Sequence, residues 1–241
     1  MAKRIAINGF GRIGRLTLRN LLSKKDIEVV AINDLTDNKT LAHLFKYDSA
    51  QGMFKGKVSA DDKFITINGK KITALTERNP SALPWKKLKV DVVLECTGIF
   101  RDKTKAGMHL EAGAKKVVLS APGKGEGIQT IVLGVNDQTL DIKNNIFSNA
   151  SCTTNCLSPV IKTLNETWGI KYGSVNTTHG FTSDQNIQDA PHSDLRRARA
   201  ATVNIVPTTT GAAVATGLVI PEVAGKLSAM AFRVPVITGS L

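Results

Sequence analysis

The sequence predicts an α/β fold in which a doubly wound parallel sheet is followed by a second domain. Short apolar runs rich in Val and Ile alternate with amphipathic stretches over the first half of the chain, as strands buried on both faces require. A glycine-rich turn follows the first apolar run, and the pattern of the chain changes near residue 150. We therefore expect one domain at residues 1–150 and a second at residues 151–241.

The first domain contains apolar runs of strand length separated by stretches with helical periodicity. Helices are expected at Arg12–Ser23, Asn38–Phe45 and Lys103–Ala112. Asn68-Gly69 lies between two alternating runs and predicts a two-residue β-hairpin inserted into this pattern. The strands of the parallel sheet are expected at Arg4–Asn8, Glu28–Asn33, Val90–Cys96, Lys116–Leu119, Thr130–Leu133 and Ile146–Ser148.

The second domain has fewer regular signals. A helix should begin near Cys152, and strands are expected at Gly173–Thr178, Val203–Pro207 and Ala229–Ile237. Residues 180–201 are polar and have no clear period. A loop of that length in a compact domain is usually functional.

Composition narrows the class of protein. The 241 residues are 42% hydrophobic and 22% charged, which is typical of a globular chain. No apolar run is long enough to span a membrane, no secretory signal is recognisable, and three cysteines do not make a disulfide framework. We therefore expect a cytoplasmic protein with no membrane partner.

The net charge of +12 raises the question of a polyanionic partner. The basic residues occur as scattered short pairs, and aromatic residues make up only 5% of the chain, so surfaces for base stacking are scarce. This pattern argues against nucleic acid and favours solvated ends of helices and strands. An anionic small molecule is the alternative partner.

The glycine-rich turn carries the first functional signal. Gly9, Gly11 and Gly14 form G-x-G-x-x-G between a predicted strand and a predicted helix, which is the context of a Rossmann-type dinucleotide site. Asp34 ends the second strand about 20 residues later, where a carboxylate accepts from the adenosine ribose and repels a 2′-phosphate. These residues predict NAD as cofactor. A strand-end cap is the alternative role of Asp34.

A thiol and an imidazole carry the second signal. Cys152 lies at the start of a predicted helix, where the helix dipole lowers the pKa of a thiol, and His179 lies near the end of a predicted strand. Together they suggest a nucleophile and its base. Taken singly, each residue is more often structural, and Cys96 is interpreted in that way. Cys156 follows one turn after Cys152, but no further ligand set supports a metal site.

Five segments in order closely resemble the phosphorylating glyceraldehyde-3-phosphate dehydrogenase family. They are Asn8–Arg15, Ser151–Cys156, Thr177–Thr182, Asp194–Arg199 and Arg233–Pro235. The resemblance implies that Cys152 attacks an aldehyde, that His179 acts as base, and that inorganic phosphate cleaves the resulting thioester. It also implies a homotetramer for the full-length protein, with glyceraldehyde 3-phosphate and inorganic phosphate as substrates.

The resemblance further implies individual ligands. The cofactor residues would be Gly9, Gly11, Arg12, Ile13, Gly14, Asp34, Arg78 and Ser120. The pocket for inorganic phosphate would contain Ser151, Thr153, Arg197, Thr210 and Gly211, and the other anion pocket Thr182 and Arg233. Two of the three arginines Arg196, Arg197 and Arg199 are then ordinary loop charges. Thr178, Gly180, Phe181 and Ser183 depart from the usual family pattern around His179 but remove no catalytic group.

The chain ends at Leu241, and the resemblance implies a C-terminally truncated member whose α+β catalytic domain, with its mostly antiparallel sheet, is incomplete. Two alternatives to the leading function stay open. One is an erythrose-4-phosphate dehydrogenase of the same superfamily. The other is a non-catalytic nucleotide- or RNA-binding module, which would make no use of Cys152 or His179.

Overall fold

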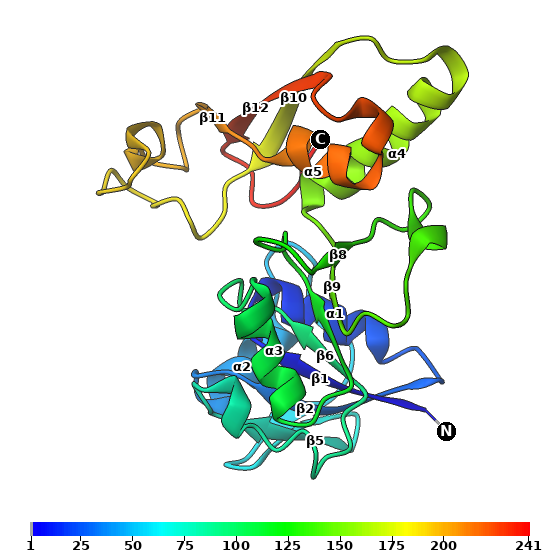
Figure 1. Ribbon diagram of the computed structural model, residues 1–241. Coiled ribbons are helices and arrows are strands. Elements are labelled where there is room, and N and C mark those ends of the chain that lie inside the picture. Colours follow the sequence, from blue (N-terminus) through cyan, green and yellow to red (C-terminus); the bar gives the residue numbers. More distant parts are fainter. Residues whose placement is uncertain (1) are drawn as a thin grey trace. The chain divides into compact units, whose positions relative to one another are not determined.

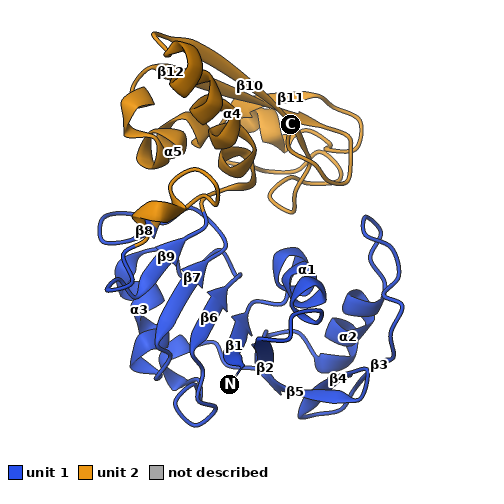
Figure 2. Ribbon diagram, turned by 90° about the vertical axis from the view of Figure 1, so that its right-hand side faces the viewer, with its two compact units in different colours: residues 1–129, 141–149 blue, residues 130–140, 150–241 orange. Residues whose placement is uncertain are grey.

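The computed structural model describes residues 2–241, which form two compact units (Figure 2). Unit 1 contains the chain up to Gln129 together with Asp141–Asn149, and unit 2 contains Thr130–Leu140 and Ala150–Leu241. The segment Thr130–Leu140 joins unit 2 because its valines, Val132 and Val135, are buried in the same cluster as Ile161 and Val223. The expected domain boundary near residue 150 did not separate this segment from the first domain.

Unit 1 is built on the predicted parallel sheet. The strands are β1 (Lys3–Asn8), β2 (Ile27–Asn33), β3 (Val58–Ala60), β4 (Phe64–Ile67), β5 (Lys70–Leu75), β6 (Val92–Glu95), β7 (Lys116–Leu119), β8 (Gln129–Thr130) and β9 (Ile146–Ser148). Their spatial order is β3-β4-β5-β2-β1-β6-β7-β9-β8. Strands β5, β2, β1, β6, β7 and β9 pair in parallel, and β3, β4 and β5 form the antiparallel insertion. The doubly wound parallel sheet is confirmed.

Three helices accompany this sheet: α1 (Arg12–Leu21), α2 (Asn38–Lys46) and α3 (Lys103–Glu111). Successive residues of a strand point to opposite faces. Accordingly, Ile7 is buried in one core with Phe45 of α2, whereas its neighbour Ala6 is buried in another core with Trp85. Burial on both faces explains why the strands have no polar alternation.

The predicted strand at Thr130–Leu133 is wrong except at its first residue, because β8 ends at Thr130. Asn136 ends the strand: its Oδ1 accepts from the backbone N–H of Val132, and its Nδ2 donates to the carbonyl of Thr130. Val132 is thereby turned into the core of unit 2.

Unit 2 combines a small sheet with two helices (Figure 1). The elements are α4 (Cys152–Trp168), β10 (Gly173–Gly180), β11 (Val206–Thr209), α5 (Ala212–Val219) and β12 (Leu227–Val234). The strand order is β10-β12-β11, with β10 parallel and β11 antiparallel to β12. The described sheet is therefore mixed, which corrects the expectation of a mostly antiparallel one. The long connection from β10 to β12, which contains α5, permits the parallel pairing.

Two features of unit 2 were not expected from the sequence. Helix α5 is apolar almost all round and offers no helical periodicity to recognise. Strand β12 stops at Val234, three residues before its predicted end, because Pro235 has no N–H to donate to a ladder. Within residues 2–241, no helix combines the length and apolar character needed to cross a bilayer.

Candidate active site and cofactor site

The three glycines of the first turn differ in what surrounds them. Gly9 has φ +89°, and a Cβ there would lie 2.7 Å from the backbone N of Thr97. A Cβ on Gly14 would lie 2.2 Å from the carbonyl oxygen of Gly9. Gly11 has nothing within 4 Å of such an atom, and no side chain caps the helix that begins beyond it. The turn thus leaves open backbone and uncapped N–H groups at a helix N-terminus, which suits a pyrophosphate.

Asp34 has the capping role that was the alternative for it, and it also contacts the glycine turn. Its Oδ2 accepts from the backbone N–H of Phe10 at 2.7 Å, and its Oδ1 accepts from that of Thr36 at 3.0 Å. The carboxylate therefore braces the glycine turn and caps the loop after β2. Each oxygen keeps a second lone pair for a ribose hydroxyl.

A cavity of about 450 Å³ opens at the carboxyl ends of β1, β2 and β6. Four predicted cofactor residues line it: Gly9, Gly11, Asp34 and Arg78. Arg12 and Ile13 form the exposed first turn of α1, Gly14 packs beneath the turn, and Ser120 follows β7. The lining also includes residues that the motif did not identify, namely Asn8, Asn33, Leu35, Glu77, Cys96, Thr97, Ile99 and Phe100.

A buried hydrogen-bond network supports this cavity from below. Glu95 Oε2 accepts from Asn8 at 2.6 Å and contacts His109 Nε2 at 3.0 Å, and Glu95 Oε1 accepts from the backbone and hydroxyl of Thr97. Trp85 Nε1 donates to His109 Nδ1 at 3.0 Å. Because an indole only donates, His109 must carry its proton on Nε2 and give it to Glu95. This network fixes two residues that line the cavity, Asn8 and Thr97.

In unit 2, Cys152 and His179 meet directly. Ser151 caps α4 by accepting from the backbone N–H of Thr154, so Cys152 is the first helical residue. Its Sγ lies 3.1 Å from Nε2 of His179, which comes from β10. The hydrogen bond to His179 lowers the pKa of Cys152 to about 7, although partial burial opposes the shift. At neutral pH a large fraction of Cys152 is therefore the reactive thiolate.

Strand register brings Arg233 beside the same imidazole. His179 of β10 is paired with Arg233 of β12, and Nη1 of Arg233 lies 3.0 Å from His179 Nδ1 and 3.3 Å from the carbonyl of Gly180. Nδ1 itself lies 2.6 Å from that carbonyl, the shorter of its two contacts, and donates to it when protonated. The guanidinium of Arg233 can only donate, so its acceptor is then the Gly180 carbonyl and not Nδ1. Nε2 then has its lone pair free to accept the thiol proton.

The residues predicted to bind phosphate belong to several segments of unit 2. Thr153 is buried, and its hydroxyl lies 3.0 Å from that of Ser240. Thr210 accepts from the N–H of Ala212 and, with Gly211, begins α5. In residues 2–241, no direct hydrogen bond joins Thr210 or Gly211 to Ser151 or Thr153. Thr182 starts the turn that ends at Gln185.

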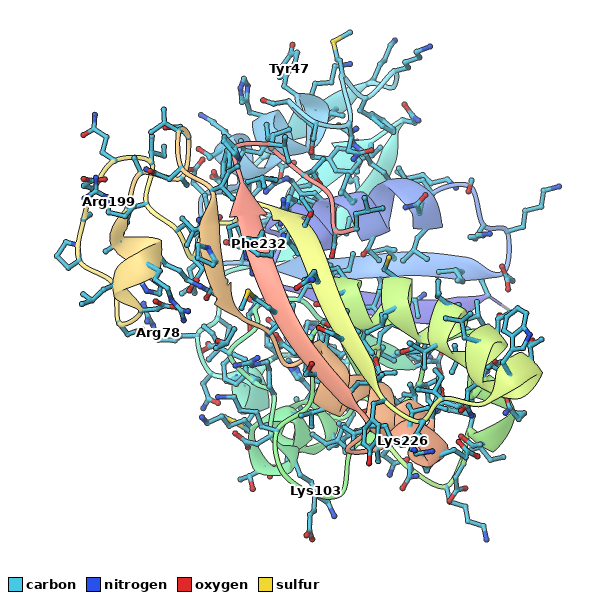
Figure 3. All side chains as sticks on the ribbon, turned by 90° about the horizontal axis from the view of Figure 1, so that it is seen from above. Tyr47, Arg78, Lys103, Arg199, Lys226 and Phe232 are labelled. Carbon is cyan, nitrogen blue, oxygen red and sulfur yellow. The ribbon has the colours of Figure 1, made fainter. Side chains whose placement is uncertain are left out.

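Exposure separates the three neighbouring arginines of the loop. The side chain of Arg197 is only 17% exposed and donates through Nε to Thr208, whereas those of Arg196 and Arg199 are 50% and 64% exposed. Arg199 extends from the outer side of the loop, away from the strand that carries Phe232 (Figure 3). Arg197 alone of the three points inward.

The remaining thiols have different environments. Burial raises the pKa of Cys96 to about 11, so this thiol stays protonated, and Cys156 is exposed one turn after Cys152. Among the described residues, no group of three or more His, Cys, Asp or Glu side chains could hold a metal ion.

A Rossmann-type unit with an open glycine turn, followed by a unit with an activated thiol, defines a nicotinamide-dependent dehydrogenase of the cysteine type. Comparison with known families gives the same class in more detail. Residues 3–103 match the NAD binding domain of glyceraldehyde 3-phosphate dehydrogenase, and residues 151–241 match the C-terminal domain of that enzyme. The chain belongs to the glyceraldehyde 3-phosphate dehydrogenase family, which confirms the resemblance and the NAD cofactor.

Individual relatives carry the same name. The chain is 57% identical to the glyceraldehyde-3-phosphate dehydrogenase of Clostridium acetobutylicum over 243 aligned positions, which cover 100% of the chain and 72% of the relative. It is 55% identical to that of Clostridium pasteurianum, over 99% of the chain and 72% of the relative. The enzyme of Mycolicibacterium smegmatis is 57% identical, over 100% of the chain and 73% of the relative.

Proposed function

We propose that this protein oxidises glyceraldehyde 3-phosphate to 1,3-bisphosphoglycerate, with inorganic phosphate as the acyl acceptor. The observation that carries the proposal is the contact of 3.1 Å between Cys152 Sγ and His179 Nε2, with the pKa of Cys152 lowered to about 7. A thiolate at the start of a helix, with an imidazole held in the accepting tautomer, is suited to covalent catalysis on an aldehyde.

In the first step, the Cys152 thiolate forms a bond to the aldehyde carbon, and the carbonyl oxygen takes up the proton held at His179 Nε2. The resulting thiohemiacetal has a hydroxyl that Nε2 can deprotonate again. Loss of that proton and of a hydride leaves a thioester. NAD, when bound, supplies the two-electron acceptor for this hydride. The Gly9–Gly14 turn and Asp34 are the residues that would hold it.

In the second step, an oxygen of inorganic phosphate attacks the thioester carbon, and the C–S bond breaks to release the acyl phosphate and the Cys152 thiolate. The thioester keeps the acyl group activated until phosphate arrives. Arg197, Thr210, Gly211, Ser151 and Thr153 are the proposed ligands of the attacking phosphate. Thr182 and Arg233 are the proposed ligands of the substrate phosphate. Planar guanidinium forks, hydroxyls and backbone N–H groups all suit phosphate oxygens.

Within this proposal, the protein acts in the cytoplasm and the full-length form is a homotetramer. The family resemblance supports both statements. Sedimentation of the purified protein would measure its assembly state.

One assay tests the reaction against its alternatives. NADH formation is followed with glyceraldehyde 3-phosphate and with erythrose 4-phosphate, each with and without inorganic phosphate. We expect sustained turnover only with glyceraldehyde 3-phosphate and phosphate together. A preference for erythrose 4-phosphate would contradict the assignment of glyceraldehyde 3-phosphate as the substrate. NAD binding without any turnover would instead favour a nucleotide-binding module.

A further inference from the structure

Arg197 carries a charge in a largely buried place, and a carboxylate of the same loop neutralises it. Nη1 of Arg197 forms an ion pair with Oδ2 of Asp184. The Arg197 side chain is 17% exposed, whereas that of Asp184 is 52% exposed. The guanidinium is thus held inside the protein, while its acidic partner stands at the solvent boundary.

A set of polar contacts holds the guanidinium in place independently of Asp184. Nε of Arg197 donates to the hydroxyl of Thr208 at 2.9 Å, and that hydroxyl donates to Oδ2 of Asp194 at 2.9 Å. Thr208 is buried on β11. One edge of the guanidinium is therefore anchored to the sheet, and its other N–H groups are available to an anion.

Asp184 has a second partner to which it can turn. Nδ1 of His192 lies 2.9 Å from the backbone N of Asp194 and 3.1 Å from its carbonyl oxygen, so the backbone of Asp194 holds the ring in place. Nε2 is 3.4 Å from Oδ2 of Asp184. A carboxylate that leaves Arg197 keeps this imidazole and water as partners.

The ion pair lies within electrostatic range of the reacting groups. Burial lowers the pKa of Arg233, the charge of Arg197 lowers it further, and the charges of Cys152 and Asp184 raise it. Arg233 is the residue that contacts His179. Asp184 is thus a negative charge among the cations that are proposed to collect two phosphates.

We propose that Asp184 is an internal counter-ion that competes with inorganic phosphate for Arg197 and thereby sets the affinity for this substrate. The inference rests on the proposed function, because that function assigns Arg197 to the attacking phosphate. A phosphate that binds the guanidinium fork must displace the Asp184 carboxylate or accept repulsion from it. Asp184 also keeps a desolvated cation neutralised while the pocket awaits phosphate.

The neighbouring ion pair provides a matched control. Arg199 and Asp189 belong to the same loop and form an ion pair of 3.3 Å, but their side chains are 64% and 54% exposed. Removing the charge of Asp189 changes the loop charge by the same amount as removing that of Asp184. Removing the charge of Asp189 leaves the ion pair of Arg197 intact.

The experiment compares Asp184→Asn with Asp189→Asn in the full chain. The half-saturating concentration of inorganic phosphate is measured by NADH formation, and the phosphate dissociation constant by calorimetry. We expect Asp184→Asn to lower both values roughly two- to fivefold, as for loss of an ion pair whose carboxylate is still in contact with water. The KM for glyceraldehyde 3-phosphate should stay unchanged. Asp184→Glu should keep the wild-type phosphate dependence, and so should Asp189→Asn.

An unchanged or weakened phosphate affinity in Asp184→Asn would overturn the counter-ion proposal, provided that its thermal unfolding matches the wild type. If that variant is not folded, Asp184→Ser is measured in its place and must show the same gain in phosphate affinity. Arg197→Gln separates the two proposals. If it weakens phosphate binding while Asp184→Asn gives no gain, only the counter-ion is wrong. If it has no effect on phosphate binding, the assignment of Arg197 within the proposed function is wrong as well.

Discussion

The nucleotide cavity of unit 1 and the thiol–imidazole site of unit 2 differ in what holds their polar groups. In unit 1, Asn8, Glu95 and His109 are almost fully buried, and each has its hydrogen bonds supplied from within the protein. In unit 2, Cys152 is exposed, and Arg197 is paired with a half-exposed carboxylate. The first site is held by buried hydrogen bonds, and the second is held by partners that are partly exposed to solvent.

This difference matches the work that each site performs. A cofactor that must be bound in one orientation is best served by donors and acceptors that are already fixed. The proposed reaction moves a proton from sulfur to nitrogen and binds two anions in turn, and such a site needs partners that can be replaced. Substitutions should therefore affect stability and cofactor affinity in unit 1, and chemistry in unit 2.

The largest effect is expected for Cys152→Ser, which should lower the rate of aldehyde oxidation by at least about a thousandfold. A hydroxyl is a far weaker nucleophile than a thiolate at neutral pH. NAD affinity, measured by fluorescence titration, should change little, because the glycine turn belongs to the other unit. Cys156→Ser is the matched control and should retain activity. Loss of NAD binding in Cys152→Ser would break the separation of the two sites.

Glu95→Ala should lower the free energy of unfolding by about 2–4 kcal/mol, because it leaves Asn8, His109 and Thr97 without their buried acceptor. When Trp168 is also replaced by Phe, Trp85 is the one tryptophan left. Its fluorescence emission should change as well, because its indole donates a hydrogen bond to His109. Denaturant unfolding and tryptophan fluorescence measure the two effects. Glu28→Ala removes an exposed pair with Arg4 and should cost less than about 1 kcal/mol. Equal costs for both variants would contradict the claim that the buried network holds the site of unit 1 together.

His179→Ala should move the pH midpoint of Cys152 alkylation by iodoacetamide from near 7 towards the ordinary thiol value of 9.0. The thiolate fraction at pH 7 would fall from about one half to roughly one per cent, because the hydrogen bond that favours the charged form is lost. A less acidic thiol is intrinsically more nucleophilic, so the midpoint is a better measure than the rate at one pH. In the wild type, alkylation should increase as the pH rises through 7. A midpoint that stays near 7 in the variant would assign the activation to the helix terminus instead.

The smallest of these effects is expected for Asp34→Asn. This change should weaken NAD binding about tenfold and narrow the preference for NAD over NADP, since it removes the carboxylate that is proposed to accept from the ribose and to repel a 2′-phosphate. The asparagine can still accept from one of the two backbone N–H groups that Asp34 now binds. Asp37→Asn removes a nearby charge that only caps α2, and it should leave the ratio of NAD to NADP affinity unchanged. If the ratio moved equally in both variants, general charge would explain the preference.

The sequence pattern was most informative where function depends on neighbours along the chain. The positions of Gly9, Gly11 and Gly14 predicted a turn whose close approaches are present in the structure. The buried support beneath it was not predicted, because Glu95 and His109 each occur in ordinary apolar or helical contexts. Glu95, a charged residue at the end of an apolar strand, was the one signal that could have been followed. Likewise, composition and spacing did not distinguish Arg197 from Arg196 and Arg199, and only the family resemblance did.

By itself, the sequence determined the parallel sheet, the glycine turn and the placement of Cys152 at a helix start, because each depends on local spacing and on the periodic burial of apolar residues. Only the tertiary structure decided that His179 lies opposite Arg233, that Thr130–Leu140 joins unit 2, and that Asp184 pairs with Arg197. These outcomes depend on strand register and on packing between distant segments. The favoured arrangement is the one that buries the most apolar surface while its polar groups keep hydrogen-bond partners. No single stretch of chain contains enough information to predict it.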